Sequence, residues 1–148
     1  SCNNNGGDMI LPNIEGITET IRLGLEAARL GPDGVDLISA HATATKMGDV
    51  IEAKAIASIY GDAPRVTALK SYMGHTMGSC GAIESIITLY MMQEGLAVPT
   101  LNLDEVDPRC SMIRHVRTQE QTKLRTAAVQ NFAFGGVNTC LLFRRFEG

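Results

Sequence analysis

Alternation of strands and helices is the feature of this chain that most narrows its possible fold. Residues 35–40 (VDLISA) form a short β-rich run bounded by turn residues, and a helix with acidic residues in its first turn is expected over 48–60. Residues 65–69 (RVTAL) repeat the strand pattern, and residues 79–95 then offer a serine cap, an apolar helix and a closing glycine. This order predicts a layered α/β domain.

Both ends of the chain carry further elements. Apolar residues recur at helical spacing over 14–30, and the Gly-Pro step that follows would end this helix. Two apolar runs, 126–134 and 137–145, flank a Gly-Gly pair and predict strands joined by a tight turn. The first residues contain no complete strand, so the sheet is expected to begin in the middle, as it would in a piece cut from a larger domain.

Composition excludes several classes of function. The chain has 148 residues, of which 45% are hydrophobic, which is enough for one domain with a core. A net charge of −3 makes no electrostatic case for binding nucleic acid or an anionic membrane, and no apolar run is long enough for a membrane span. Four scattered cysteines predict neither a zinc site nor a disulfide scaffold, and they suit a reducing cytoplasm.

A histidine lies in the loop after each of the two predicted parallel strands. Because ligand sites gather at the carboxyl ends of such strands, His41 and His75 are expected to converge on one pocket. Two structural histidines with local hydrogen bonds are an equally weighted alternative. Thr43 and Thr45 alternate after His41, so their hydroxyls either face the same cleft or bond the local backbone.

Lys70 stands at the end of the second predicted strand. Its side chain is either a solvated charge or a buried cation that needs a carboxylate. Glu52 is the nearest suitable partner by residue type, and a buried lysine would bias the protonation of its neighbours.

Residues 131–138 (NFAFGGVN) combine two phenylalanines with a Gly-Gly turn. Glycines let the backbone approach a ligand, and free N–H groups there would stabilise an oxyanion. A plain hairpin with two phenylalanines in the core is the alternative.

Cys80 is the cysteine best placed to react, because a helix N-terminus favours the thiolate. Its neighbours, however, are small residues of the kind found where a helix packs closely on a sheet. We therefore expect Cys80 to serve packing.

Taken together, these stretches resemble the C-terminal half of a β-ketoacyl-[acyl carrier protein] synthase of the synthase II type. The family's His-Gly-Thr-x-Thr stretch, with its following Gly-Asp and glutamate, corresponds to residues 41–52. Its Lys-x-x-x-Gly-His stretch corresponds to 70–75, its linker to 98–108 (VPTLNLDEVDP), and its closing aromatic-glycine loop to 131–138. The motifs occur in the family's order over nearly the whole chain.

The resemblance implies a thiolase-like fold, in which two similar halves form one αβαβα layered domain with mixed sheets and packed helices. Residues 1–148 would be the C-terminal half-domain, and the first residues would end an interdomain segment. The N-terminal half, which carries the family's nucleophilic cysteine, is absent. Lys70 and His75 would then serve a cysteine outside this chain, and the chain alone would be inactive.

The activity implied is that of an acyltransferase in fatty acid or polyketide synthesis. The whole enzyme would condense malonyl-carrier protein with an acyl thioester, with loss of carbon dioxide. Substrates would arrive on the phosphopantetheine of acyl carrier protein, with no covalently bound cofactor and no metal. The implied partners are this carrier protein, the N-terminal half and a second copy of the whole enzyme, in the cytoplasm.

The resemblance also assigns roles to single residues. His41 and His75 would donate hydrogen bonds to the malonyl thioester oxygen, and Lys70 with Glu52 would orient them. The Phe132 N–H would supply part of the oxyanion hole. The residues implied in substrate binding are Thr43 and Thr45 on the pantetheine arm, Phe134 as gate of the acyl pocket, and Gly135 and Gly136 beside it.

Five residues depart from the family's pattern: Ala42, Ala44, Lys46, Met73 and Ala133. Where glycine is usual, as at 42 and 133, the added methyl groups put substrate preference in question more than the chemistry. Two alternative functions stay open. One is a non-catalytic subunit that resembles a chain-length factor, and the other is a thioester hydrolase based on Cys80 and His75.

Overall fold

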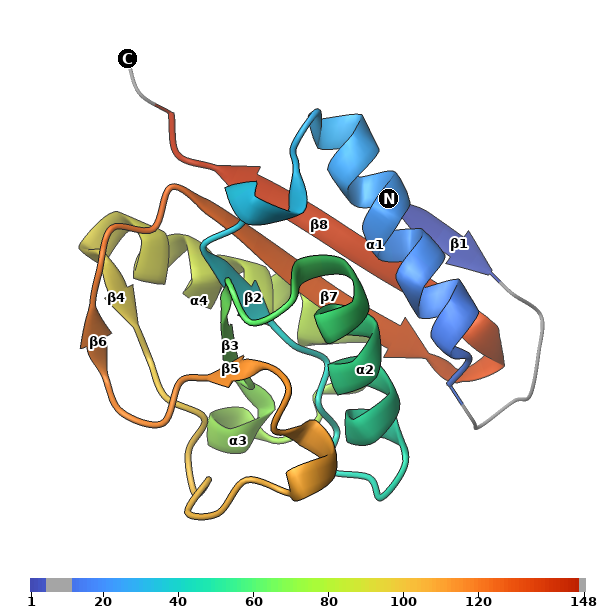
Figure 1. The fold of residues 1–148 in the computed structure, drawn as a ribbon. Coiled ribbons are helices and arrows are strands. Elements are labelled where there is room, and N and C mark those ends of the chain that lie inside the picture. The colour runs from blue at the N-terminus through green and yellow to red at the C-terminus, as the bar shows by residue number, and fades with distance from the viewer. Residues whose placement is uncertain (5–11, 147–148) are drawn as a thin grey trace.

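The computed structural model describes residues 1–4 and 12–146. Its central feature is a mixed sheet with helices on both faces (Figure 1). The strands of this six-stranded sheet, in spatial order, are β1 (Cys2–Asn4), β8 (Val137–Arg144), β7 (Thr126–Ala133), β2 (Leu37–Ser39), β3 (Arg65–Thr67) and β5 (Arg114–His115). A second sheet pairs β4 (Leu96–Ala97) with β6 (Glu120–Gln121). The helices are α1 (Ile14–Ala28), α2 (Gly48–Tyr60), α3 (Lys70–Met73) and α4 (Cys80–Glu94).

The centre of the sheet is parallel and one side is antiparallel. Strand β2 runs parallel to both β3 and β7, and β3 runs parallel to β5. Strand β8 pairs antiparallel with β7 and β1, so the last two long strands form the predicted hairpin. The predicted mixed α/β fold is therefore confirmed.

Two hydrophobic clusters lie on opposite faces of the sheet. Ile38 of β2 belongs to a cluster with Ile17 of α1 and Ile56 of α2, whereas its neighbour Leu37 packs with Met91 of α4. Successive side chains of a strand point to opposite faces, so β2 is buried on both sides. This double burial explains why the apolar residues Leu37 and Ile38 are consecutive in β2.

The helix boundaries follow local signals with two exceptions. The side chain of Asn13 accepts the N–H of Gly16 and caps α1, and Gly95 ends α4 in the left-handed region at φ 64°, as predicted. Helix α1 ends at a left-handed Arg29, before the predicted Gly-Pro stop. The prediction that Ser79 caps α4 was wrong, because its hydroxyl instead donates to the Thr76 carbonyl at 2.8 Å.

The first residues contribute a short strand to the sheet, which was not predicted from the sequence. The polar segment Cys2–Asn4 pairs antiparallel with β8 at the edge of the sheet. Because one of its sides faces solvent, this strand carries no apolar alternation that would have revealed it. The predicted interdomain segment extends into residues 5–11, which lie outside the described residues.

Helix α4 has one buried face and one exposed apolar face. Glu84, Thr88 and Met91 point inward, whereas Ile86 and Tyr90 are 56% and 62% exposed. Leu89 is exposed beside them. Apolar side chains of this size at helical spacing on the surface indicate an unpartnered face.

None of the helices in the described part of the chain is both long and apolar enough to cross a membrane.

Candidate functional site

The carboxyl ends of β2 and β3 bring the two loop histidines together. His41 follows β2 after one residue, and His75 follows the short helix α3 that succeeds β3. Their rings meet edge to face, with centroids 5.5 Å apart. The two histidines meet because β2 pairs parallel with β3, and the expectation that both serve one pocket stays a prediction.

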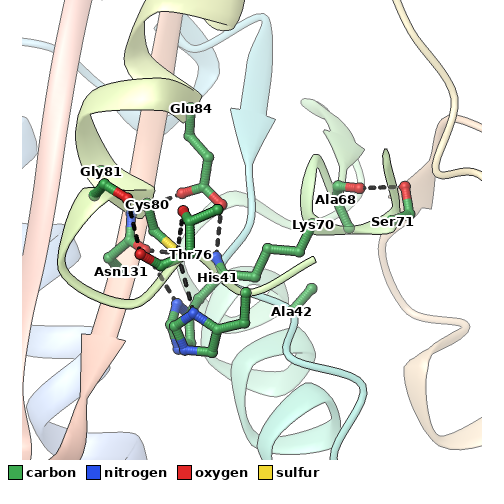
Figure 2. A network of polar contacts seen from close by, with 12 residues as sticks. His41, Ala42, Ala68, Lys70, Ser71, Thr76, Cys80, Gly81, Glu84 and Asn131 are labelled. Carbon is green, nitrogen blue, oxygen red and sulfur yellow. Dashed lines mark hydrogen bonds and ion pairs between the residues drawn. The ribbon is translucent and has the colours of Figure 1, made fainter. Parts of the chain in front are cut away.

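A buried ion pair lies directly behind the histidines (Figure 2). Lys70 Nζ is 2.6 Å from Glu84 Oε1, and the two residues are 7% and 0% exposed. Asn131 Nδ2 donates to Glu84 Oε2 at 2.9 Å, and Asn131 Oδ1 faces Lys70 Nζ at 3.5 Å. Charges this far from water are tolerated only when they are paired and further hydrogen-bonded, and the network meets both needs.

The predicted pairing of Lys70 with Glu52 was wrong. Glu52 was chosen only because it is a carboxylate. In the structure α4 lies against the sheet, and its Glu84 reaches Lys70 instead. Glu84 and Asn131 are thus site residues that the sequence reasoning missed. Glu84 had one usable signal, since it is the only charged residue between Cys80 and Gln93 on an otherwise apolar helix.

Glu52 has a different task, which is to hold the His41 loop. From α2 its two carboxylate oxygens accept the backbone N–H groups of His41 and Ala42, each at 2.8 Å. Burial raises the pKa of Glu52 to about 7, although these two hydrogen bonds oppose that rise. The loop after β2 is therefore fixed to the next helix through one buried side chain.

The orientation of Asn131 determines the tautomer of His41. Its amide nitrogen faces the Glu84 carboxylate and its amide oxygen faces the Lys70 ammonium. The reverse orientation would place the amide N–H donors against the ammonium and the amide oxygen against the carboxylate. That oxygen lies 3.2 Å from His41 Nδ1, which must therefore carry the proton and leave a lone pair on Nε2. Burial, and then the Lys70 charge, lower the pKa of His41 to about 4, so the ring is neutral at neutral pH.

His75 has the opposite polarity. The backbone N–H of Met77 donates to His75 Nδ1 at 3.1 Å, so that nitrogen is an acceptor and the proton lies on Nε2. Met77 reaches this position in the left-handed region, at φ 54°. One site thus presents an N–H from His75 and a lone pair from His41.

Cys80 is buried at the start of α4 and is 2% exposed, as its predicted packing role requires. Its sulfur lies 3.1 Å from His75 Nδ1 (Figure 2 shows its contact with Thr76). Because Nδ1 already presents its lone pair, the sulfur faces it with a thiol hydrogen rather than as a thiolate. This polarity is the reverse of the one that a cysteine nucleophile needs from its histidine.

A cavity of about 660 Å³ lies beside the histidines. Residues from both histidine loops line it, among them Thr43, Thr45, Lys70 and His75. The two threonine hydroxyls are 3.4 Å apart. Thr45 also accepts the N–H of Gly48 at 3.2 Å, so the local backbone role is present as well.

The aromatic-glycine loop divides into two parts. Phe132 is buried at the end of β7 with its ring 5.8 Å from that of His41. Phe134 is 70% exposed, and Gly135 and Gly136 turn the chain at φ 75° and 78°. Of the residues proposed from this loop, only Phe132 contacts a histidine of the site.

Within residues 1–4 and 12–146, no group of three histidine, cysteine, aspartate or glutamate side chains is placed to hold a metal ion.

Residues 1–104 match the family model described as the C-terminal domain of β-ketoacyl synthase. The chain is 35% identical over 147 residues to 3-oxoacyl-[acyl-carrier-protein] synthase 1 of Haemophilus influenzae, covering 97% of this chain and 35% of that protein. The chain therefore spans about a third of the length of this curated relative.

Solved structures give the same picture. A β-ketoacyl synthase from Burkholderia phymatum STM815 superposes with a TM-score of 0.95 at 40% identity, over 99% of this chain and 36% of that one. The ishigamide ketosynthase/chain length factor superposes with a TM-score of 0.94 at 32% identity, again over 99% of this chain and 36% of the other.

Ala42 and Ala44 hold left-handed backbone conformations, at φ 33° and 59°. A side chain there strains the backbone by about 1–2 kcal/mol, and glycine removes that strain at a smaller cost in chain entropy. We expect Ala42→Gly to raise the free energy of unfolding by ~0.5–1 kcal/mol in urea titrations. Ala57→Gly is the matched control in α2 and should lower it by ~1 kcal/mol. Equal signs for the two variants would contradict this explanation.

The lowered pKa of His41 predicts acid sensitivity. An unfolded chain binds a proton at His41 near pH 6.5, whereas the folded chain binds it only near pH 4. Stability should therefore fall as the pH drops from 6.5 to 4, by up to ~3 kcal/mol. Glu52 acts in the opposite direction between about pH 4.5 and 7, because its pKa is raised.

The contribution of His41 can be isolated by comparison with His41→Gln. Glu52 titrates in both proteins, so its effect cancels in the difference between their free energies of unfolding. The free energy of unfolding of the wild type, minus that of His41→Gln, should be measured from pH 8 to 4.5. It should be constant above about pH 7 and should decrease as the pH falls below that value. A difference that does not vary with pH would show that His41 titrates normally.

Proposed function

Because the chain belongs to the β-ketoacyl synthase family and corresponds to its C-terminal domain, we propose that it is the histidine-bearing part of a condensing acyltransferase. The whole enzyme would take an acyl group from a carrier thioester onto a cysteine that lies outside this chain. Malonyl-carrier protein would then lose carbon dioxide, and the resulting carbanion would attack the acyl thioester. The product would be a β-ketoacyl thioester extended by two carbons, with the cysteine released.

The observation that carries this proposal is the buried network of Lys70, Glu84 and Asn131 beside two histidines whose protons lie on different ring nitrogens. Burying such a network costs folding free energy. Two histidines beside it would not improve the fold, so their placement favours a role in acting on a ligand. Its charges sum to zero, so the site can stabilise a developing anion by directed hydrogen bonds without drawing in a permanent counter-ion.

The two histidines would divide the work. His75 Nε2–H would donate to the malonyl thioester oxygen and stabilise the enolate that forms there. His41, whose Nε2 carries a lone pair, would accept a hydrogen bond in the site. The sequence had suggested two donors, and the orientation of Asn131 instead favours one donor and one acceptor. Lys70 would keep His41 neutral, and Glu52 would keep its loop in place.

The remaining residues would bind the substrate. Thr43 and Thr45 line the cavity and would hold the phosphopantetheine arm that acyl carrier protein presents. The Phe132 N–H would complete an oxyanion hole for acyl transfer, next to His41. Phe134 would gate the acyl pocket, because it stands exposed on a turn that Gly135 and Gly136 make adaptable.

The remaining two thirds of the enzyme would dock on α4. The outer face of this helix exposes Ile86, Leu89 and Tyr90, while its inner face carries Glu84 and Cys80 to the site. A partner that covers the outer face would bring the nucleophile near the histidines. We place the whole enzyme in the cytoplasm as a homodimer, in keeping with the four free cysteines of this chain.

A non-catalytic, chain-length-factor-like subunit is the second candidate, because one of the similar structures is named for a ketosynthase and a chain length factor. A subunit without chemistry has no use for a buried ion pair that orients His41 through Asn131. The hydrolase alternative is less favoured still, since the Cys80 thiol is buried and faces an acceptor nitrogen.

The catalytic proposal is tested by joining the chain with the rest of its enzyme and following malonyl decarboxylation by intact mass. His75→Ala should slow decarboxylation about 100-fold, because it removes one preorganised oxyanion donor, while acylation of the nucleophile in the other part persists. Lys54→Met removes an exposed ammonium on α2 and is a control that should leave the rate unchanged. Acylation of the isolated chain at Cys80 would instead establish the hydrolase.

The docking proposal is tested by copurification of the chain with the remaining two thirds. Leu89→Glu places a charge on the outer face of α4 and should weaken association at least tenfold by desolvation of that charge. Leu101→Glu is the control, because Leu101 is equally exposed on the loop after β4. The docking face is misassigned if both variants associate like the wild type.

A further inference from the structure

The backbone of the loop that carries His75 does not by itself fix the direction of its imidazole. It lies on a glycine-containing loop after α3, and the residue is exposed. The preceding Gly74 has a φ of 73°, so the backbone there is one that glycine favours. The direction of the imidazole must therefore come from the few groups that contact it: Met77 N–H, the edge of His41, and Cys80.

Only one assignment of donor and acceptor fits the contact between His75 and Cys80. Met77 N–H can only donate, so His75 Nδ1 is an acceptor, and at 3.1 Å a sulfur lone pair facing it would be repelled. The thiol must turn its hydrogen toward Nδ1. Thr76 Oγ1 donates to the same sulfur at 3.3 Å and thereby fixes the side of the sulfur from which the S–H points.

Cys80 is well placed to hold this geometry. It is the first residue of α4, it is 2% exposed, and the same helix carries Glu84 of the ion pair one turn later. The thiol is thus tied to the most rigid part of the site, whereas His75 is on a loop. A contact from a rigid helix to a loop side chain reduces the freedom of the side chain.

We propose that Cys80 is a positioning residue, whose thiol, oriented by Thr76, holds His75 in the Nε2–H form with that N–H directed into the site. This inference rests on the proposed function for its consequence in catalysis, but the hydrogen-bond arrangement can be tested without it. The role differs from that of a nucleophile, because the thiol acts through His75 and forms no bond with substrate.

The direct test is ¹⁵N NMR of the imidazole nitrogens in the full chain, which has only three histidines to assign. In the wild type, Nδ1 should have the shift of an unprotonated nitrogen and Nε2 that of a protonated one. Cys80→Ala removes one of two donors to Nδ1, so the ratio of the Nε2–H to the Nδ1–H form should fall about fivefold, the equivalent of one neutral hydrogen bond. Cys80→Ser keeps a donor and should stay within about twofold of the wild type.

Two further variants make the result specific. Cys140→Ala removes another buried thiol, on β8, and should leave the His75 ratio unchanged. Thr76→Val removes the donor that orients the sulfur and should move the ratio in the same direction as Cys80→Ala. If neither Cys80→Ala nor Thr76→Val changes the ratio, or if wild-type Nδ1 carries the proton, the proposal is wrong.

A kinetic arm connects the tautomer with the reaction. In the enzyme reassembled with its other two thirds, Cys80→Ala should lower kcat for malonyl decarboxylation about fivefold with little change in KM, and Cys80→Ser should restore it. If the reassembled wild type does not decarboxylate at all, the proposed function fails, while the NMR ratio still decides the role of Cys80.

Discussion

The buried ion pair between Lys70 and Glu84 is the interaction on which the arrangement of the site depends. It joins the segment after β3 to α4, which packs on the sheet, and Asn131 extends it to β7. Since an unpaired charge at this depth would cost several kcal/mol, the three elements are held in one relative position. That position orients the Asn131 amide, and the amide in turn settles which nitrogen of His41 carries its proton.

The histidine loops are held by backbone groups as much as by side chains. Glu52 binds two successive N–H groups of one loop, and the N–H of Met77 turns back onto His75 in the other. Both loops contain non-glycine residues in the left-handed region, at Ala42 and Met77. Backbone strain of this kind persists where surrounding contacts compensate for it, and here the compensating contacts are those that direct the imidazoles.

In the proposed enzyme, helix α4 would connect the site with the part that lies outside this chain. Its inner face carries Cys80 and Glu84, and its outer face exposes Ile86, Leu89 and Tyr90. In the proposed enzyme, a partner bound on the outer face would be linked through one rigid helix to the ion pair and to the contact with His75. The division of a single active site between two parts of a protein then has a simple structural basis.

The sequence by itself determined the order of the main elements, the bounds of α2, the hairpin of β7 and β8, and the meeting of the two histidines. These follow from local rules, namely apolar periodicity, turn glycines and the shared edge of parallel strands. The sequence did not reveal β1, whose polar edge residues carry no periodic signal, or the short helix α3 at Lys70.

Only the tertiary structure decided which carboxylate meets Lys70. Glu52 and Glu84 are equivalent by residue type, and the choice between them depends on how α2 and α4 pack on opposite faces of the sheet. The same holds for the polarity of the histidines, which depends on the orientation of an amide on β7 and of a backbone N–H after α3. Local patterns specify elements, but which side chains meet across a sheet is set by packing between segments far apart in the chain.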